Sequence, residues 1–512
     1  MAISNPGGNL NSVPSPTRQA LTGNFLDLAS TSGQGWAQQY VPDLMEKEAE
    51  VFGNRTISGF LSQVGAEESM TADQVVWSEQ GRLHLSYTGH IPDAATQANA
   101  TGTPAGGVFE IDQNIDGVAV DTSSIDHGVR VNDIVLISDA SATVQCIVTM
   151  VSNDQVNVAL YDASASNGRL SDAGIAQDTS SATVATLLVV GSEYAKGTSY
   201  NDTTATVTAA SSRQSNEPQF KSFSNKPIII KDFYAVSGSD ASRIGWVEVS
   251  SEDGKSGYLW YLKAESETRL RFTDYLEMAM LESIKGDTDQ STVDAFLSDT
   301  STDHFGTEGL WAAIESRGNV TTGITGVNPA TDLAEFDAIL AEFDNQGAIE
   351  ENMMFVNRAS SLAIDDMLAS MNSYGAGGTS YGVFNNSEDM ALNLGFSGFR
   401  RGSYDFYKSD FRYLNDKATR GGINAAAGAN AIRGVMVPAG TSTVYDQMVG
   451  SNMKRPFLHV RYRASQTDNR KLKTWVTGSV GATTSALDAM EIHMLSERCL
   501  ITQGANNFML MK

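Results

Sequence analysis

The sequence predicts an α+β fold built from more than one compact unit, with an all-β module inserted into a larger scaffold. The chain has 512 residues, and single hydrophobic cores stop growing beyond roughly 250–300 residues. Residues 106–197 are rich in Val, Ile, Thr and Ser in strand-like runs, whereas a helical apolar stripe covers residues 258–283. Hydrophobic residues make up 41% of the chain and charged residues 19%, a globular composition.

The first 60 residues are predicted to be an N-terminal arm. Residues 1–22 are rich in Asn, Ser, Pro and Gly and offer little core material, and a helix is predicted from Trp36 to Ala49. Residues 1–28 lack the layout of a signal peptide, and no apolar run reaches about 18 residues. We therefore expect a protein that folds in the cytoplasm and does not cross a membrane.

Residues 61–225 are predicted to form an extended loop that carries the all-β insertion at about 106–197. The strongest signal is a hairpin in which Gln145–Val151 and Gln155–Tyr161 flank the turn Ser152-Asn153-Asp154. Val118–Val120 is predicted to be a further short strand. The strands are too short and too rich in β-branched residues for helices, so a barrel or sandwich is expected.

The scaffold resumes with an apolar strand, Pro227–Tyr234, and a long helix from about Tyr258 to Ser283. Phe272, Leu276 and Met280 lie on one face of that helix, together with Ala279. The helix would be about 39 Å long, at 1.5 Å per residue. A helix of that length needs a partner surface along its side, and we expect a sheet.

A mixed α/β region and a closing set of strands follow. Helices are predicted around residues 310–314, 333–343 and 362–371, a short strand at Met353–Val356, and strands at the end of the chain: Gly434–Val437, Phe457–Arg463 and Met490–Met494. In the strand Phe457–Arg463 the apolar side chains alternate with His and Arg. One face is therefore predicted to cover a core and the other to present positive charge outward.

The formal net charge of −25 argues against a protein that grips nucleic acid, because such contacts depend on Lys and Arg. The charge is uneven: residues 395–512 carry 16 Lys+Arg and 8 Asp+Glu, whereas the rest of the chain carries 19 and 52. Opposite charges can steer identical copies together, or they can meet inside one subunit. On the first interpretation, nine residues are candidates for contacts between subunits: Arg412, Arg420, Lys454, Arg455, Arg461, Arg463, Arg470, Lys471 and Lys473.

No catalytic, cofactor-binding or metal-binding constellation is predicted. The six histidines form no His-x-x-x-His pair, and the two cysteines, Cys146 and Cys499, cannot build a four-thiolate zinc site. Asp287, Asp289 and Asp294 are spaced like part of a calcium loop that lacks its glycine turn and its distal Glu. Gly375–Gly378 follows a helix, where a dinucleotide-binding loop would open one. We expect a protein without a cofactor that is not an enzyme.

The order of these elements resembles the Hong Kong 97 fold of the major capsid proteins of tailed bacteriophages. The passages Arg455–Tyr462, Lys473–Gly481 and Gly504–Phe508 are similar to those of crAss-like phage capsid proteins. The resemblance implies a peripheral domain over 226–332 and 456–512, with a spine helix at about 258–283. It also implies an axial domain over 333–455.

The resemblance further implies a virion protein that assembles with itself into hexamers and pentamers in the host cytoplasm. Its other partners would be a portal, minor or auxiliary capsid proteins and packaged DNA bound without sequence specificity. Two other classes stay open: an acidic multidomain carbohydrate-active enzyme, and a surface-layer or adhesive protein with a β binding module. Tryptophans such as Trp77, Trp311 and Trp475 could stack on sugars, although scattered tryptophans are more often core residues.

Overall fold

The computed structural model describes residues 66–80, 86–92, 106–114, 117–162, 170–176, 185–197, 215–216, 220–238, 248–250, 256–286, 296, 306–346, 349–371, 398–439, 441–446, 451–480 and 483–512. The predicted arm with its helix Trp36–Ala49 lies outside the described residues, as do Asp287–Asp294 and Gly375–Gly378. The described chain is α+β, as predicted. It divides into two compact units: one contains Met1–Trp77 and Ser224–Lys512, and the other is Ser78–Phe223.

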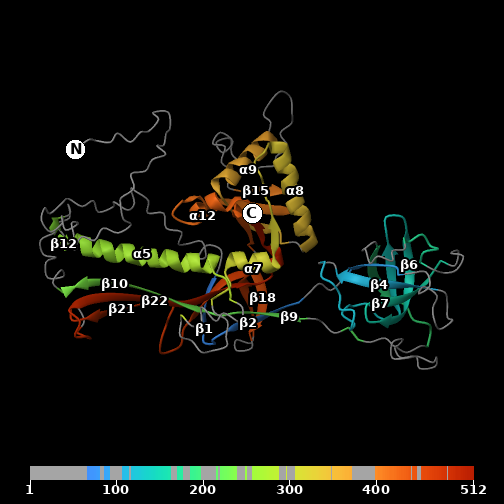
Figure 1. The fold of residues 1–512 in the computed structure, drawn as a ribbon, viewed down its shortest axis with the longest axis horizontal. Helices are drawn as coiled ribbons and strands as arrows, with labels where there is room; N and C mark the ends of the chain where they lie inside the picture. Colours follow the sequence, from blue (N-terminus) through green and yellow to red (C-terminus); the bar gives the residue numbers. More distant parts are fainter. Residues whose placement is uncertain are drawn as a thin grey trace. The chain divides into compact units, whose positions relative to one another are not determined.

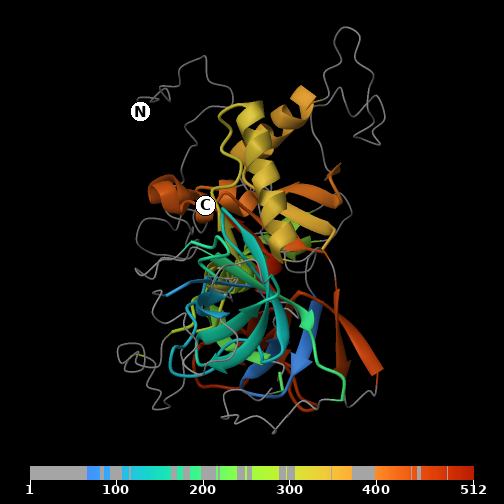
Figure 2. The same ribbon diagram turned by 90° about the vertical axis from the view of Figure 1, so that its right-hand side faces the viewer.

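The unit Ser78–Phe223 is a closed six-stranded barrel with the strand order β3-β4-β7-β6-β5-β8 (Figure 2). Its strands are β3 (Ser86–His90), β4 (Gly106–Asn114), β5 (Asp133–Ser138), β6 (Thr143–Ser152), β7 (Gln155–Leu160) and β8 (Ala185–Ser192). Side chains alternate along each strand, so every second residue points into the barrel. Phe109, Val135 and Val156 are fully buried there and form part of one core cluster.

The predicted hairpin is confirmed as β6 and β7, in which Ser152 pairs with Gln155 and Asn153 adopts a left-handed φ of 51°. Two details differ from the prediction. The barrel includes β3, which lies before residue 106. Val118–Val120 is not a strand: only Ala119 makes a single bridge, to Gln113, because the chain turns back on β4 at this point.

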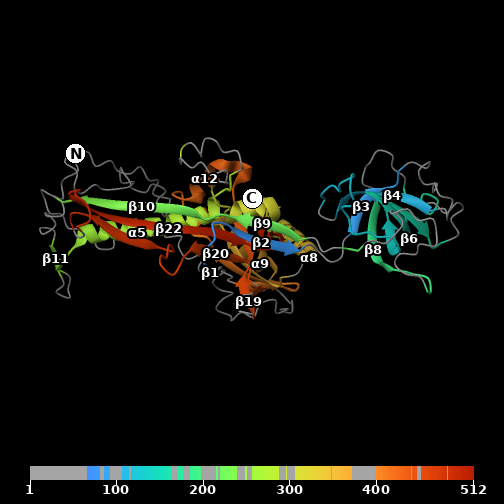
Figure 3. The ribbon, with the colours of Figure 1, turned by 90° about the horizontal axis from the view of Figure 1, so that it is seen from below.

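The larger unit contains a five-stranded sheet in the order β1-β20-β22-β10, with β21 also paired to β22 (Figure 3). The strands are β1 (Ala66–Met70), β10 (Ile228–Ser237), β20 (Leu458–Arg463), β21 (Lys473–Gly478) and β22 (Ala489–Thr502). All ten residues of β10 pair with the first ten of β22, from Ile228 opposite Arg498 to Ser237 opposite Ala489. On its other side β22 pairs with β21 and then with β20.

The predicted long helix is α5 (Leu259–Glu282), and it runs along β10 and β22 (Figure 1). Phe272 and Leu276 pack with Ile230 of β10 and Met494 of β22. Each such side chain contributes about 1.5–3 kcal/mol when it is fully buried. The expected partner surface of the helix is therefore this sheet. No helix in the described residues is long and apolar enough to cross a membrane.

A six-stranded sheet in the order β13-β23-β17-β14-β16-β15 forms the rest of the core. Its strands are β13 (Asn319–Thr321), β14 (Glu351–Val356), β15 (Gly398–Arg401), β16 (Tyr404–Asp410), β17 (Gly434–Pro438) and β23 (Met509–Met511). Met354 and Val356 of β14 pack with the predicted helices α8 (Pro329–Gln346) and α9 (Arg358–Met371). Phe355, on the opposite face, packs in a cluster with the end of α5 and with β20 and β22. This sheet is therefore covered on both faces.

Shorter elements complete the larger unit. The strand pair β2 (Val75–Gln80) and β9 (Phe220–Asn225) carries the chain into the barrel unit and back. The others are β11 (Glu248–Ser250), β12 (Ser256–Tyr258), α7 (Leu310–Arg317), α11 (Arg412–Asn415), α12 (Arg420–Ala427), η3 (Gly428–Asn430), β18 (Thr441–Asp446), β19 (Ser451–Pro456) and η4 (Ala505–Asn507).

The outward basic face predicted for β20 is not open to solvent. Leu458 and Val460 are buried as expected, but His459 is fully buried too, and its Nδ1 lies 3.3 Å from the carbonyl oxygen of Pro456. The Arg461 and Arg463 side chains are only 21% and 31% exposed. The reason is that β1 pairs in parallel with β20, so that Glu68 of β1 covers Arg461, while Arg463 pairs with Asp73 and with Glu497 of β22.

Asn225, at the end of β9, links three separate segments of the larger unit. Its Nδ2 donates to the carbonyl oxygens of Leu500, at 2.6 Å, and Glu308, at 3.0 Å. Its Oδ1 accepts from the Thr307 hydroxyl and the Glu308 amide. The residue is fully buried, so these polar groups have no water to replace it.

Replacing Asn225 by Ala should lower the free energy of unfolding by about 2–4 kcal/mol, because several buried polar groups lose their partner. Asn430→Ala is the matched control: Asn430 is exposed, and a change within about 0.5 kcal/mol is expected. Urea denaturation followed by fluorescence measures both. Equal stability of the two variants would contradict the role of Asn225.

Both thiols should be unreactive in the folded chain. Burial raises the pKa of Cys146 and of Cys499 to about 12, and the thiolate is the reactive form. At pH 8 a colorimetric disulfide reagent should label neither thiol in native protein and both after unfolding in guanidinium. Rapid labelling of either thiol before unfolding would contradict the buried placement.

Candidate functional site

The nine basic residues predicted for subunit contacts lie in two places. Arg412 and Arg420 belong to α11 and α12, and the other seven lie between β19 and β21. Lys454 and Arg455 are on β19, where side chains fall outside the described residues. The other five residues of the larger group, from Arg461 to Lys473, run along the closing strands of the five-stranded sheet.

Arg420 is engaged within the chain. Its Nη1 forms an ion pair with Oε2 of Glu282, the last residue of α5. The Tyr413 hydroxyl donates to the other carboxylate oxygen of Glu282 at 2.6 Å. Burial, and next this hydrogen bond to Glu282, raises the pKa of Tyr413. Arg412 differs: it is exposed and has no ion pair in the part of the chain that the structure describes.

Glu497 of β22 is the centre of an ion-pair network on the closing strands. Its carboxylate lies 3.1 Å from Nη1 of Arg463 and 2.9 Å from Nε of Arg470. The Glu497 side chain is 5% exposed, so the two guanidinium groups replace its water. Arg463 also pairs with Asp73, and this hydrogen bond and the arginine's charge lower the pKa of Asp73.

The carboxylates of β1 complete this network. Glu68 lies 3.6 Å from Nη2 of Arg461, and Glu67 pairs with Lys471. Glu67 also lies 3.9 Å from the buried Arg498, whose pKa is lowered by burial. The edge strand β1 is therefore joined to β20 by backbone hydrogen bonds and by charge, and to β22 by charge.

Six of the nine candidates thus have carboxylate partners in the same chain: Arg420, Arg461, Arg463, Arg470, Lys471 and Lys473. This arrangement agrees with the alternative interpretation that opposite charges meet inside one subunit. A paired arginine can still donate to a neighbouring molecule, since its guanidinium has five N–H groups. The contact of these residues with a second copy remains a prediction.

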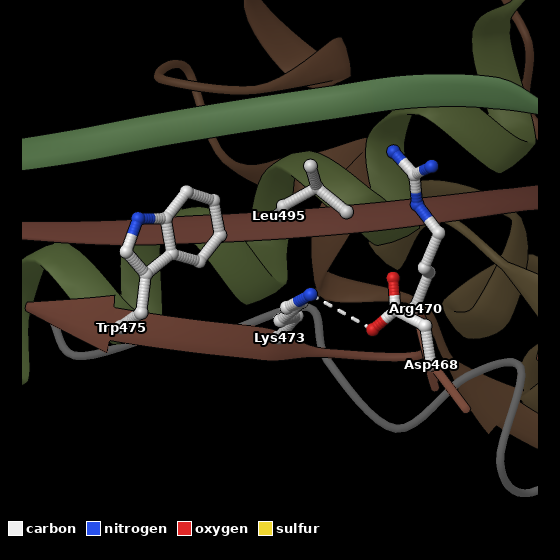
Figure 4. A pocket seen from close by; sticks show the side chains of 5 residues that line it. All are labelled: Asp468, Arg470, Lys473, Trp475 and Leu495. Carbon is white, nitrogen blue, oxygen red and sulfur yellow. Dashed lines mark hydrogen bonds and ion pairs between the residues drawn. The ribbon is translucent and has the colours of Figure 1, made fainter.

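A shallow hollow of about 350 Å³ lies next to this network (Figure 4). It is lined by Arg470, Lys473 and Trp475, with Asp468 and Leu495. Lys473 Nζ lies 2.8 Å from Oδ1 of Asp468, and this hydrogen bond lowers the pKa of Asp468. Both side chains of that pair are more than 40% exposed, so the hollow is open to solvent.

An aromatic ladder continues from the hollow across three strands. The rings of Trp475 and His493 stack with centroids 5.2 Å apart, and those of His493 and Phe233 with centroids 6.1 Å apart. The register places these residues directly opposite one another on β21, β22 and β10. Phe233 is 58% and Trp475 37% exposed. This ladder was not predicted from the sequence, because a local pattern does not reveal which strands pair.

This face of the sheet offers stacking surfaces and cations over a broad area. His493 is bonded to the Thr477 hydroxyl at 2.7 Å and therefore has a partner in the sheet. Within the described ranges no group of three or more His, Cys, Asp or Glu side chains could hold a metal ion. The geometry is suited to contact with another extended surface.

Comparison with known proteins gives structural similarities only. No protein-family model matches the sequence, and no curated protein matches it. A solved structure from Microbacterium phage Oxtober96 is similar at a TM-score of 0.34 and 8% identity, over 94% of this chain and 98% of that chain.

Two further similar structures are phage capsids by their titles. The mature capsid of bacteriophage PhiM1 gives a TM-score of 0.30 at 9% identity, over 59% of this chain and 76% of that chain. The capsid of the cyanophage P-SCSP1u gives 0.30 at 10% identity, over 62% and 80%. Scores of this size do not establish a shared fold.

Glu497→Gln should lower the free energy of unfolding by about 1–3 kcal/mol, because two guanidinium groups lose a buried counter-charge. Asp468→Asn removes a carboxylate from an exposed pair and should cost less than about 1 kcal/mol. Thermal and urea unfolding at low salt compare the two variants. A loss for Asp468→Asn as large as that for Glu497→Gln would show that Glu497 has no special role.

Proposed function

We propose that this chain is the major capsid protein of a tailed bacteriophage. In this proposal it is a structural subunit and not an enzyme. Copies assemble in the host cytoplasm into the hexamers and pentamers of an icosahedral shell around double-stranded DNA. The observation that carries the proposal is the order in which the elements follow one another and pair.

That order begins with the pair β2 and β9, which brackets the barrel, and continues with β10 and the long helix α5. The α/β unit around the six-stranded sheet comes next. The strands β20 to β22 then return to the five-stranded sheet, where β22 pairs with β10. The resemblance to the Hong Kong 97 fold implies the same order: a loop with an insertion, a strand and spine helix, an axial domain, and returning strands.

On this proposal α5 is the spine helix, and the barrel is the insertion in the extended loop over residues 61–225. Residues 226–332 and 456–512 form the peripheral domain and residues 333–455 the axial domain, with residues 1–60 as the arm. These assignments agree with the way α5 packs against β10 and β22, because those strands come from the two separate stretches assigned to one domain.

The open face of the five-stranded sheet is the surface proposed to meet neighbouring copies. It exposes the Phe233 and Trp475 rings beside Lys473, and aromatic and arginine side chains are enriched in protein interfaces. A portal and minor capsid proteins are the other proposed partners. A net charge of −25 suits a wall that holds DNA without sequence-specific binding.

The tryptophans give little support to a carbohydrate-binding function. Trp77 and Trp311 are 8% and 4% exposed and belong to packed regions. Trp475 is partly exposed, but one face of its ring stacks on His493. The described residues thus offer no specific reason to prefer the carbohydrate-active or the adhesive alternative.

The proposal is tested by producing the chain alone and measuring its size by analytical ultracentrifugation and negative-stain microscopy. Capsomers or megadalton shells are expected, because the exposed sheet face and the complementary charges favour self-association. A stable monomer at all concentrations, above all one that turns over a substrate, would overturn the proposal.

Assembly should weaken as salt rises from low to about 1 M, because exposed charges are screened over about 8 Å already at physiological ionic strength. Arg412→Glu should reduce the yield of particles further, since Arg412 is exposed and has no ion pair among the described residues. Its thermal unfolding should be unchanged. A particle yield that changes neither with salt nor with Arg412→Glu would show that the basic residues do not contribute to the interface.

A further inference from the structure

The barrel carries an apolar patch on its outer wall. In β5, β6 and β8 the buried residues alternate with residues that point away from the core. Five of the outward residues are large and apolar, and none of them belongs to the barrel's core cluster: Ile134, Leu136, Ile147, Leu188 and Val190. We call these five residues the barrel patch.

The strand register makes the barrel patch continuous. Leu136 of β5 lies directly opposite Leu188 of β8, and Ile134 lies opposite Ile147 of β6. Val190 sits at the bulge where β5 and β8 shift register. Leu188 is 42% and Val190 59% exposed, so the patch faces away from the barrel's own core. Water-facing wall positions in a soluble barrel are ordinarily polar.

The patch is also uncharged, in a unit that is strongly acidic. Residues 78–223 contain 16 Asp+Glu and 6 Lys+Arg. None of the other residues of the three strands that are exposed or half-buried is charged: Ser138, Thr143, Gln145, Thr149, Met150, Ser152, Thr186, Val189, Gly191 and Ser192. Asp133, at the start of β5, is buried and accepts a hydrogen bond from the Arg130 amide at 2.8 Å.

This distribution of charge points to one kind of partner. In a two-fold contact between identical copies, the same surface patch is used on both sides. Two acidic faces would repel, so a contact between two barrels requires a face without net charge. A basic partner would instead be expected to use the acidic remainder of the barrel wall.

We propose that the barrel patch is a self-complementary contact that joins the barrels of two copies of this chain. The inference rests on the proposed shell function, because a shell supplies second copies at close range. Contacts that bury little area are weak between free proteins. Copies already held side by side bind through a weak patch because their effective concentration is high.

The test uses two cysteine variants of the full chain, Val190→Cys and Val118→Cys. Both valines are on the barrel unit and equally exposed, at 59% and 60%. Val118 follows β4, which is separated by β3 from β8, the strand of Val190, and by β7 from β6. The native Cys146 and Cys499 are fully buried, so the engineered thiol is the accessible one. A short flexible bismaleimide is the probe, and covalent dimers are counted on a denaturing gel.

Val190→Cys should give about tenfold more covalent dimer than Val118→Cys, because neighbouring patches hold the two thiols at high effective concentration. Adding Leu188→Asp to Val190→Cys should reduce the dimer to the level of the Val118→Cys control. Circular dichroism and thermal unfolding should show that the barrel stays folded, since residue 188 points outward.

Equal dimer yields from the two cysteine variants, in particles and in concentrated free subunits, would overturn the inference even where shells form. Failure of the proposed function shows up separately, as an unsubstituted chain that never forms particles in the ultracentrifuge. In that case the crosslinking of concentrated subunits still decides whether the barrel patch joins two copies.

Discussion

The pairing of β10 with β22 is the constraint on which the rest of the larger unit depends. These two strands share ten paired positions and form the floor against which α5 buries Phe272 and Leu276. β22 also supplies the partner for β20 and β21, so every strand of this sheet except β1 pairs with it. Without this pairing, α5 would have no continuous apolar surface along its length.

Most of the candidate basic residues form ion pairs within their own chain. The carboxylates of β1 and Glu497 lie against the arginines of the closing strands, and this network fixes an edge strand that is parallel to its neighbour. Farther along the same face of the sheet lie the aromatic rings and partly paired cations, beginning at the hollow that Arg470 and Trp475 both line. One sheet thus combines an edge whose charges are paired within the chain with exposed aromatic side chains, Phe233 and Trp475.

The sequence predicted best the elements whose signal is local. The stripe of Phe272, Leu276 and Met280 predicted α5, and the turn at Asn153 predicted the β6–β7 hairpin, because helical periodicity and turn chemistry are encoded in adjacent residues.

What the sequence could not predict depends on residues far apart in the chain. The parallel pairing of β1 with β20 joins residues near 66 to residues near 459, and it buries His459 and covers Arg461. The aromatic ladder likewise needs three strands in register. The sequence therefore predicted the cluster of basic residues, but it did not predict the carboxylates of the same chain with which they pair.

The wide spacing of the β10–β22 partners sets an order of events during synthesis. Every strand of the barrel lies between Ser86 and Ser192, whereas Ile228 must wait for Arg498 before it can pair. Domains generally fold as their residues leave the ribosome, and long-range strand pairing is slow. The barrel can thus mature while the ribosome is still translating, and the surfaces of the larger unit take shape only after nearly all of the sequence has been made.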